Sequence, residues 1–369
     1  MRQLATIRRI KDIQPIEGAD KIELCQVDGW QVVAQKGLHR KDLLVIYCEI
    51  DSFLPIRPEF EFMRKSSYKK MADGTEGFRL KTIKLRGKLS QGLILPLDVL
   101  YPVAEKLNIN KEGEEPHYIY FINGIQMNGP DDDWNEYLEG MNVTDILGIK
   151  KYEQPIPAQL SGKVRGMFPT FIKKTDQERI QNLIEYFDKY KDIEFEVTEK
   201  LDGSSCTYYM KDGQFGVCSR NLDLLEGNGT MWKLAKELHI REYLATKGDY
   251  AIQGEVVGEG IQGNPYKLIG QKFFVFDIWD IEHQRHFTSA ERLNFIGPTF
   301  MKSVPVLENA DSMPLRMTLD QLLQVAEGES ALNSLTIREG LVFKALKRVE
   351  GQVLSFKVIN NKYLLSDTK

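Results

Sequence analysis

One lysine in this sequence stands where it could do covalent chemistry. Residues 193–198 alternate apolar and polar side chains, which predicts a strand, and Lys200 follows at its end, before Asp202 and Gly203. A lysine amine is a weak nucleophile at its ordinary pKa of about 10.4, so desolvation, a nearby cation or a metal on its target must help it. A strand end would hold Lys200 rigidly, and Gly203 would let backbone approach a phosphate. By itself the pattern also fits a surface turn.

Five later segments carry residue types that suit work on a nucleotide. Aromatic rings stack on bases, basic side chains neutralise phosphate charge, and carboxylates bind Mg²⁺. In chain order the segments are SRN (219–221), GE (254–255), FFVFDI (273–278), EGLVFK (339–344) and SFK (355–357).

In this order and spacing, the segments resemble the motif set of the covalent nucleotidyltransferases, the superfamily of ligases and capping enzymes. The sequence from Lys200 to Gly203 resembles motif I of this superfamily, and Glu255 resembles the glutamate of motif III. The later motifs follow in order: Phe276-Asp277 resembles motif IIIa, Glu339-Gly340 resembles motif IV, and Lys357 resembles the lysine of motif V. The resemblance covers about residues 168–362.

Within the superfamily, the sequence most resembles ATP-dependent RNA ligases that carry an OB module at the N-terminus. The stretches LGIKKYEQPIP (147–157), GMFPTFIKKTDQERIQ (166–181) and GEGIQGNPYKL (258–268) support this. DNA ligases and capping enzymes place an OB domain after motif V, whereas only 12 residues follow Lys357 here (369 − 357).

The resemblance implies three transfers that use ATP and RNA. Lys200 attacks the α-phosphorus of ATP to give lysyl-AMP, the AMP passes to an RNA 5′-phosphate, and a 3′-OH displaces it. Asp202, Glu255 and Glu339 would hold Mg²⁺ or Mn²⁺, partly through its waters. The other interpretation of each carboxylate is a solvated group at a strand end.

The resemblance also implies nucleotide contacts. Phe276 would stack on adenine, although FFVF also fits a buried core strand, and Glu199 would contact the adenine edge. Arg220 would bind the ribose or the phosphate of the 5′ end, and Lys344 and Lys357 would neutralise the α-phosphate.

Three positions near these motifs stay open. The family often has two lysines in motif V, but Ser355 takes the first place, so Lys357 acts alone or Lys362 assists. Lys174 and Arg179 are further candidates for nucleotide contacts, and a solvated helix start explains them equally well.

The first hundred residues predict a small β-barrel. Turn signals recur at 17–20, 28–29 and 36–42, and the run 43–48 fits a strand buried on both sides. The stretch resembles the OB modules of tRNA-binding domains in ADKIELCQVDGW, SFLP and KLRGKLSQGLILP. Lys84, Arg86 and Lys88 alternate, so in one strand they would line one face and contact RNA; a solvated sheet face is the alternative.

The predicted fold class is α+β: an N-terminal OB-like β-barrel, then an antiparallel-sheet nucleotidyltransferase (ATP-grasp-like ligase) domain. We expect an OB-fold module at 1–100, a connecting segment at 101–165, with a linker near KKYEQPIPAQ, and the adenylyltransferase domain at 166–369. Capping boxes predict helices that start at Thr175, Thr288 and Thr318. A further helix is expected at 232–244, and a hairpin turn at Asp212-Gly213.

Composition and charge limit the possible cellular location and partners of the protein. The net charge is −4, no apolar run approaches about 20 residues, and the four cysteines are scattered, so we expect a cytoplasmic monomer with no membrane contact and no structural zinc. We expect His283 and His286 on the surface. The RNA substrate would carry 3′-OH and 5′-phosphate ends, for example at a nick in a duplex. Two alternatives remain: a non-catalytic RNA-binding protein with a ligase-like fold, and a DNA-ligase-like nick-sealing enzyme.

Overall fold

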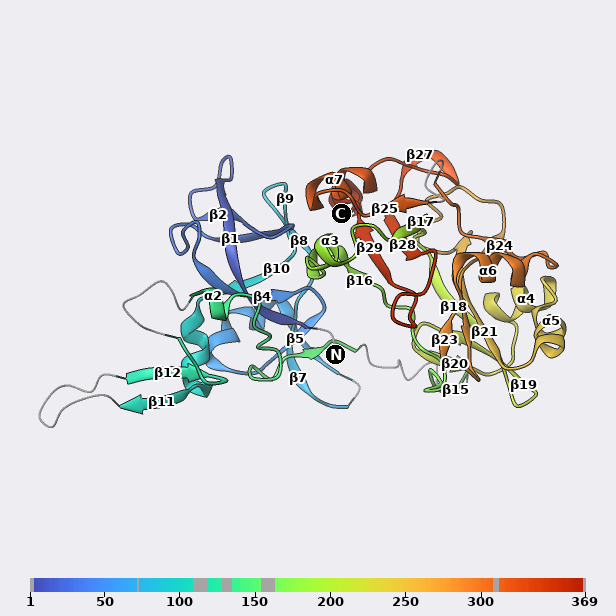
Figure 1. The fold of residues 1–369 in the computed structure, drawn as a ribbon, viewed down its shortest axis with the longest axis horizontal. Helices are drawn as coiled ribbons and strands as arrows, with labels where there is room; N and C mark the ends of the chain where they lie inside the picture. Colours follow the sequence, from blue (N-terminus) through green and yellow to red (C-terminus); the bar gives the residue numbers. More distant parts are fainter. Residues whose placement is uncertain are drawn as a thin grey trace, which may run out of the picture. The chain divides into compact units, whose positions relative to one another are not determined.

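The computed structural model describes residues 3–71, 73–108, 118–127, 135–153, 163–307 and 312–367. It divides the chain into two compact units, Met1–Ile156 and Pro157–Asp367. We call them unit 1 and unit 2 (Figure 1). The expected linker near 150–159 lies largely outside the described residues.

Unit 1 is built on a nearly closed five-stranded barrel. Its strands run in the order β10-β4-β1-β2-β3, and the backbone N–H of Gln91, beside β10, donates to the carbonyl of Gln31 on β3 at 2.7 Å. All six residues of β4 are buried, which confirms a strand covered on both sides. The strands are β1 (Ala5–Pro15), β2 (Ile22–Val27), β3 (Trp30–Gln35), β4 (Leu44–Glu49) and β10 (Gly92–Leu95).

Smaller elements pack on the outside of this barrel. Ile122, Leu138 and Leu147, from the segment expected to connect two domains, join the outer core of unit 1. These elements are β5 (Ser52–Pro55), η1 (Pro58–Met63), α1 (Arg64–Ser67), β6 (Tyr68–Lys70), β7 (Glu76–Arg79), β8 (Ile83–Leu85), β9 (Lys88–Ser90), η2 (Leu97–Val103), β11 (Glu105–Asn108), β12 (Tyr118–Ile122), β13 (Ile125–Gln126), α2 (Asn135–Leu138) and β14 (Lys150–Lys151).

The basic stretch of unit 1 forms a hairpin, which corrects the prediction of a single basic strand. Arg86 and Gly87 have φ values of 48° and 80° and turn the chain between β8 and β9. In the register Lys84 faces Leu89 and Leu85 faces Lys88, so the two lysines lie on opposite faces of the hairpin. Lys84, Arg86 and Lys88, which we call the hairpin cations, are all exposed.

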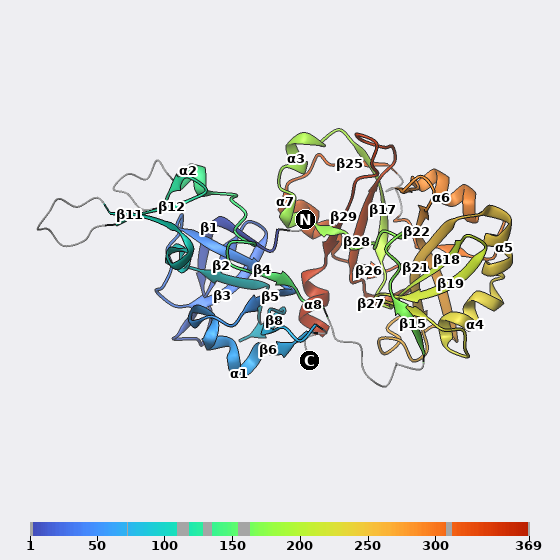
Figure 2. The same ribbon diagram turned by 90° about the horizontal axis from the view of Figure 1, so that it is seen from below.

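Unit 2 contains two main sheets that share one connection. The larger sheet runs β15-β20-β19-β18-β21-β22-β23, with β24 beside β22, and the smaller runs β16-β29-β28-β17-β25. Residues 201–203 join β17 of the smaller sheet directly to β18 of the larger one (Figure 2). The strands are β15 (Val164–Met167), β16 (Glu178–Arg179), β17 (Glu194–Lys200), β18 (Ser204–Lys211), β19 (Gln214–Ser219), β20 (Leu222–Leu224), β21 (Tyr250–Gly258), β22 (Gln271–Asp280), β23 (Arg285–His286), β24 (Lys302–Ser303), β25 (Met313–Pro314), β26 (Glu329–Ser330), β27 (Asn333–Ile337), β28 (Gly340–Ala345) and β29 (Ser355–Ile359).

Helices cover the outer faces of both sheets. Apolar residues of α4, α5 and α6 pack on the larger sheet, and α7 packs on the face of the smaller sheet that carries Phe195, Val197 and Phe343 (Figure 1). Because side chains alternate along a strand, Lys200 belongs to the opposite face of the smaller sheet. The helices are η5 (Ile180–Asn182), α3 (Tyr186–Lys189), α4 (Thr230–Glu237), α5 (Ile240–Lys247), α6 (Ser289–Ile296), α7 (Leu319–Ala326) and α8 (Asn361–Asp367).

The helix predictions differ in outcome. Thr288 and Thr318 form complete capping boxes and start α6 and α7, as expected. The helix expected after Thr175 is wrong, because Glu178 and Arg179 instead pair in parallel with β29, so tertiary pairing overrides the local signal. The helix expected at 232–244 is interrupted at His239, whose φ is 52°.

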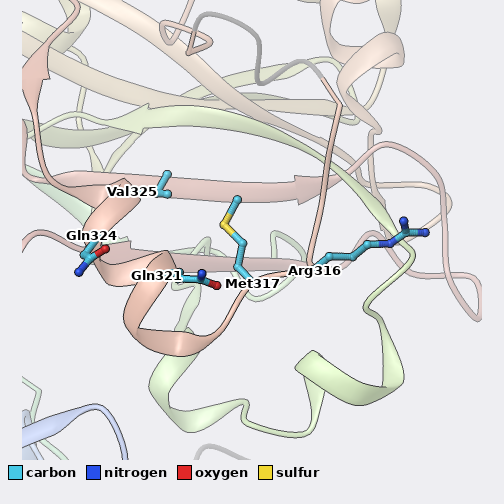
Figure 3. Close-up of a pocket in the computed structure, with 5 residues that line it drawn as sticks. All are labelled: Arg316, Met317, Gln321, Gln324 and Val325. Atoms are coloured by element: carbon cyan, nitrogen blue, oxygen red, sulfur yellow. The ribbon is translucent and has the colours of Figure 1, made fainter.

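A shallow hollow beside α7 has no link to the nucleophile. Arg316, Met317, Gln321, Gln324 and Val325 line it (Figure 3). Since α7 packs on the face of the sheet that points away from Lys200, this hollow is separate from the site described next. Among the described residues, none of the helices has the length and apolar character that crossing a membrane needs.

Candidate active site

Lys200 is held at the end of β17 and faces a carboxylate. Its Nζ donates to Oε2 of Glu339 at 2.6 Å, and both side chains are only partly exposed, at 27% and 18%. Lys200 pairs with Gly340 in the β17–β28 register, so Glu339 lies one residue before the partner strand begins. The fold thus brings together two motifs that are 139 residues apart.

Asp202 and Gly203 form the turn that carries the chain from one sheet to the other. A Cβ on Gly203 would lie 2.4 Å from the carbonyl oxygen of Val256 and 2.9 Å from Cγ of Glu255. The sequence suggested that this glycine clears space for a phosphate. The structure gives a separate reason, since any larger residue would push the turn away from β21 and from the carboxylate of Glu255.

Glu255, on β21, has a strongly perturbed carboxyl group. Burial raises its pKa to about 7; Lys200 opposes the shift, while the negative charges of Glu339 and Asp202 add to it. The electrostatics therefore place three predicted metal carboxylates and the predicted nucleophile in one cluster. Strongly perturbed carboxyl groups cluster at functional sites.

The donor set suits a hard cation. All three groups are carboxylates, and the crowding of Glu255 by its neighbours is a strain that a divalent cation would relieve. Within the parts of the chain that the structure describes, no three His, Cys, Asp or Glu residues form a set that could ligate one ion directly. Binding partly through water stays a prediction.

Two predicted phosphate-binding cations share one acidic neighbour. Lys357 Nζ lies 3.5 Å from Oδ1 of Asp176, and Arg220 Nη2 lies 3.8 Å from the same atom. Arg179 is the register partner of Lys357, so it lies at the same level of the sheet. Among the residues that the structure describes, the buried hydroxyl of Ser355 has no hydrogen-bond partner. Lys174 donates to the side chain of Asn221, next to Arg220.

The predicted adenine contacts lie on different surfaces. Phe276 is partly buried and packs beside Leu201 and Phe274, next to the nucleophile's strand. Glu199 is buried on the other face of β17 from Lys200, and its Oε2 accepts a hydrogen bond from the backbone of Ala331 at 2.7 Å. Burial raises the pKa of Glu199, and its hydrogen bonds partly offset the shift. The adenine role of both residues stays a prediction.

Lys344 belongs to a buried charge network that the sequence did not reveal. Its Nζ donates to Oδ1 of Asp277 at 2.5 Å, and the other carboxylate oxygen, Oδ2, lies 3.2 Å from Nδ1 of His286. Burial alone would raise the pKa of Asp277, but Lys344 and His286 outweigh it and hold the pKa below its usual value. His286 is therefore not a surface residue as predicted, whereas His283 is largely exposed. Contact of Lys344 with a phosphate would require breaking this pair.

Lys362 has an ion-pair partner away from Lys200. Lys362 was the second candidate for the role of the motif V lysine. Its side chain forms an ion pair with Glu327 at 2.6 Å. The hairpin cations belong to unit 1. Three residues that were not predicted contact the site residues: Asp176, Tyr266 and Tyr363. No motif or spacing in the sequence pointed to them.

Comparisons with known proteins agree with this geometry. An OB-fold domain model matches residues 4–97, and an RNA ligase model matches residues 193–359. The comparison with curated proteins gives no significant match.

Solved structures of a Naegleria gruberi RNA ligase resemble this chain over its whole length. A mutant with AMP and Mn is 41% identical, with 99% of each chain covered and a TM-score of 0.75. A mutant with ATP and Mn is 41% identical, with 98% of each chain covered and a TM-score of 0.74. The ligase with PPi is 41% identical, with 100% of this chain and 99% of that chain covered and a TM-score of 0.74.

An OB barrel followed by an antiparallel-sheet domain with a lysine among carboxylates defines an OB-containing nucleotidyltransferase, which confirms the predicted fold class. The chain belongs to the RNA ligase family.

Proposed function

We propose that this protein uses ATP to join an RNA 3′-OH to an RNA 5′-phosphate, through lysyl-AMP and adenylated RNA. The cluster of Lys200 with Glu339, Glu255 and Asp202 carries the proposal. Lys200 Nζ forms a bond to the α-phosphorus, and pyrophosphate leaves. The RNA 5′-phosphate then takes the AMP from Lys200, and the 3′-OH displaces AMP with loss of its proton. The structures of the Naegleria ligase with ATP, AMP and PPi support ATP as the nucleotide.

The chain's own groups hold Lys200 in place. Its Nζ donates to Oε2 of Glu339, so this ion pair must open before the amine can reach the α-phosphorus. A bound Mg²⁺ or Mn²⁺ would supply positive charge for the phosphates, and Asp202, Glu255 and Glu339 are the residues proposed to hold it. Lys357 and Arg220, which both lie within 4 Å of Asp176 Oδ1, would bind phosphate oxygens in its place.

The substrate is proposed to be RNA with both ends available, as at a nick in a duplex, and the hairpin cations would grip its backbone. Such contacts supply affinity without reading sequence. We propose a cytoplasmic monomer, on the basis of the scattered cysteines, all four of which are free and buried.

Transfer of label from ATP tests the proposal. Protein incubated with Mg²⁺ and ATP labelled at the α-phosphate should form a covalent, acid-labile adduct. Lys200→Ala should form none, and Lys200→Arg should fail as well, because arginine stays protonated. Lys200→Ala should still seal RNA that is already adenylated. An adduct on Lys200→Ala would refute the assignment of the nucleophile.

Label transfer, together with a nick-sealing assay, separates the two alternatives. A non-catalytic RNA-binding protein would form no adduct although it is folded and binds RNA. A DNA-ligase-like enzyme would form the adduct but seal nicks with DNA on both sides as fast as nicks with RNA ends.

A further inference from the structure

Two tyrosine hydroxyls from separate segments of the chain form hydrogen bonds with Asp202, two residues after the nucleophile. The hydroxyl of Tyr363, on α8, donates to Oδ2 of Asp202 at 2.5 Å. The backbone N–H of Asp202 donates to the hydroxyl oxygen of Tyr266 at 2.6 Å. One tyrosine therefore contacts the carboxylate and the other the main chain, so together they fix both the place and the direction of Asp202.

The segment that carries Tyr266 is built to be rigid. Residues 259–270 turn sharply, with φ near +50° at Gln262, Asn264 and Lys267. The side chain of Asn264 bonds both the N–H and the C=O of Leu268, and the Gln262 amide donates to the carbonyl of Gly203 at 3.3 Å. The segment thus contacts the Asp202-Gly203 turn at two places. Tyr266 itself is almost fully buried, at 3% exposure.

The helix that carries Tyr363 is tied to the other side of the site. Asn360, fully buried, donates from its backbone to the carbonyl of Glu339 at 2.9 Å and from its side chain to the carbonyl of Arg338 at 3.0 Å. Its Oδ1 accepts from the backbone of Lys362 at 2.9 Å, which orients the first turn of α8. The position of Tyr363 is therefore set relative to Glu339, the partner of Lys200.

We propose, on the basis of the proposed function, that Tyr363 and Tyr266 are positioning residues for Asp202 in lysine adenylation. Tyr363 donates to one carboxylate oxygen of Asp202, and Tyr266 accepts from its backbone N–H. Partners of this kind typically change activity or metal affinity by about 10- to 100-fold when they are removed.

Tyr363→Phe removes one hydroxyl and keeps the ring. In the full-length protein, we expect single-turnover lysyl-AMP formation to slow by about 10-fold or more, with an unchanged melting temperature. Ser366→Ala is the matched control, since the Ser366 hydroxyl bonds the carbonyl of Tyr363 in the same helix and does not reach Asp202. It should adenylate like the wild type.

A double-mutant cycle shows whether Tyr363 acts through Asp202. In an Asp202→Asn background, Tyr363→Phe should add little further loss, because the carboxylate it directs is already gone. Equal fold losses in both backgrounds would overturn the proposal and indicate a general structural role. Wild-type rates for Tyr363→Phe would overturn it as well.

Hydrogen–deuterium exchange gives a readout that needs no catalysis. In nucleotide-free protein, Tyr266→Phe should speed exchange of the Asp202 amide, whose hydrogen bond it removes, and leave β19 unchanged. Unchanged exchange at Asp202 would remove Tyr266 from the proposal. If the wild type forms no adduct, the proposed function fails; if it does and Tyr363→Phe matches it, only the present inference fails.

Discussion

Replacing Glu255 by glutamine should make unit 2 more stable and much less active. The carboxyl pKa is raised from 4.5 to about 7 in the folded protein, mainly by burial, with Glu339 and Asp202 adding to the shift. The folded state therefore holds a proton that the unfolded chain releases between those values. Stability is lost as the pH rises through this window, and the full penalty applies above the folded pKa.

The size of the effect follows from the shift. About 2.5 pKa units (7 − 4.5), at about 1.4 kcal/mol each, give a penalty of about 3 kcal/mol at pH 7 and above, and under about 0.5 kcal/mol at pH 4.5. Glutamine carries no charge and escapes this penalty. For a unit of about 200 residues, the melting temperature at pH 7 should rise by about 6–12 °C.

Differential scanning calorimetry from pH 5 to pH 8 would measure this difference, with Glu259→Gln, an exposed carboxylate one residue after β21, as the control. The same Glu255→Gln protein should form lysyl-AMP slower by orders of magnitude, because metal stabilisation is worth several kcal/mol. A Glu255→Gln protein that is no more stable than the wild type at pH 7.5, or a gain that does not shrink toward pH 5, would refute the electrostatic reasoning.

Further predictions test the other groups. Asp277→Asn should destabilise unit 2 by about 3–5 kcal/mol in calorimetry, since it leaves Lys344 buried without its ion-pair partner, and restoring stability with Lys344→Met in the same chain would confirm the cause. A chain beginning at Lys163 should still form lysyl-AMP but seal nicked RNA poorly; sealing as fast as the full chain would contradict a role for unit 1 in RNA binding. Changing the three hairpin cations to alanine should mimic that truncation, with the largest loss at low salt in a salt titration of sealing, because salt screens the same phosphate contacts in the unchanged protein. A loss that is the same at every salt concentration would argue against phosphate contacts.

The strands that carry the motifs could be predicted because their signals are local. Residues 193–198 alternate apolar and polar side chains, and the structure gives a strand over Glu194–Lys200 that ends at the nucleophile. Arg179 pairs in parallel with Lys357, which is far away in the chain. A local sequence pattern cannot reveal this pairing, so the capping signal at Thr175 predicted a helix that the fold does not form. The hairpin at Arg86-Gly87 had a signal, the glycine, but the alternation of charges around it suggested one continuous strand.

The contacts among charged groups could not be predicted, because they depend on which faces of two sheets meet. Lys344 has the spacing of a phosphate ligand, yet the larger sheet brings Asp277 to its ammonium and buries both. The tyrosines that hold Asp202 come from a long turn and from the last helix, and neither carries a pattern that points to the nucleophile.

The candidate site pairs its cations with carboxylates. Glu339 pairs with Lys200, and Asp176 lies within 4 Å of both Lys357 and Arg220. Lys200 and Lys357 are partly buried, and without these carboxylates their charges would lower the stability of the fold. In the proposed reaction, phosphate oxygens would replace Asp176 as the partner of Lys357 and Arg220, and Lys200 would leave Glu339 to attack the α-phosphorus. We therefore propose that nucleotide binding and the opening of the Lys200–Glu339 ion pair are coupled.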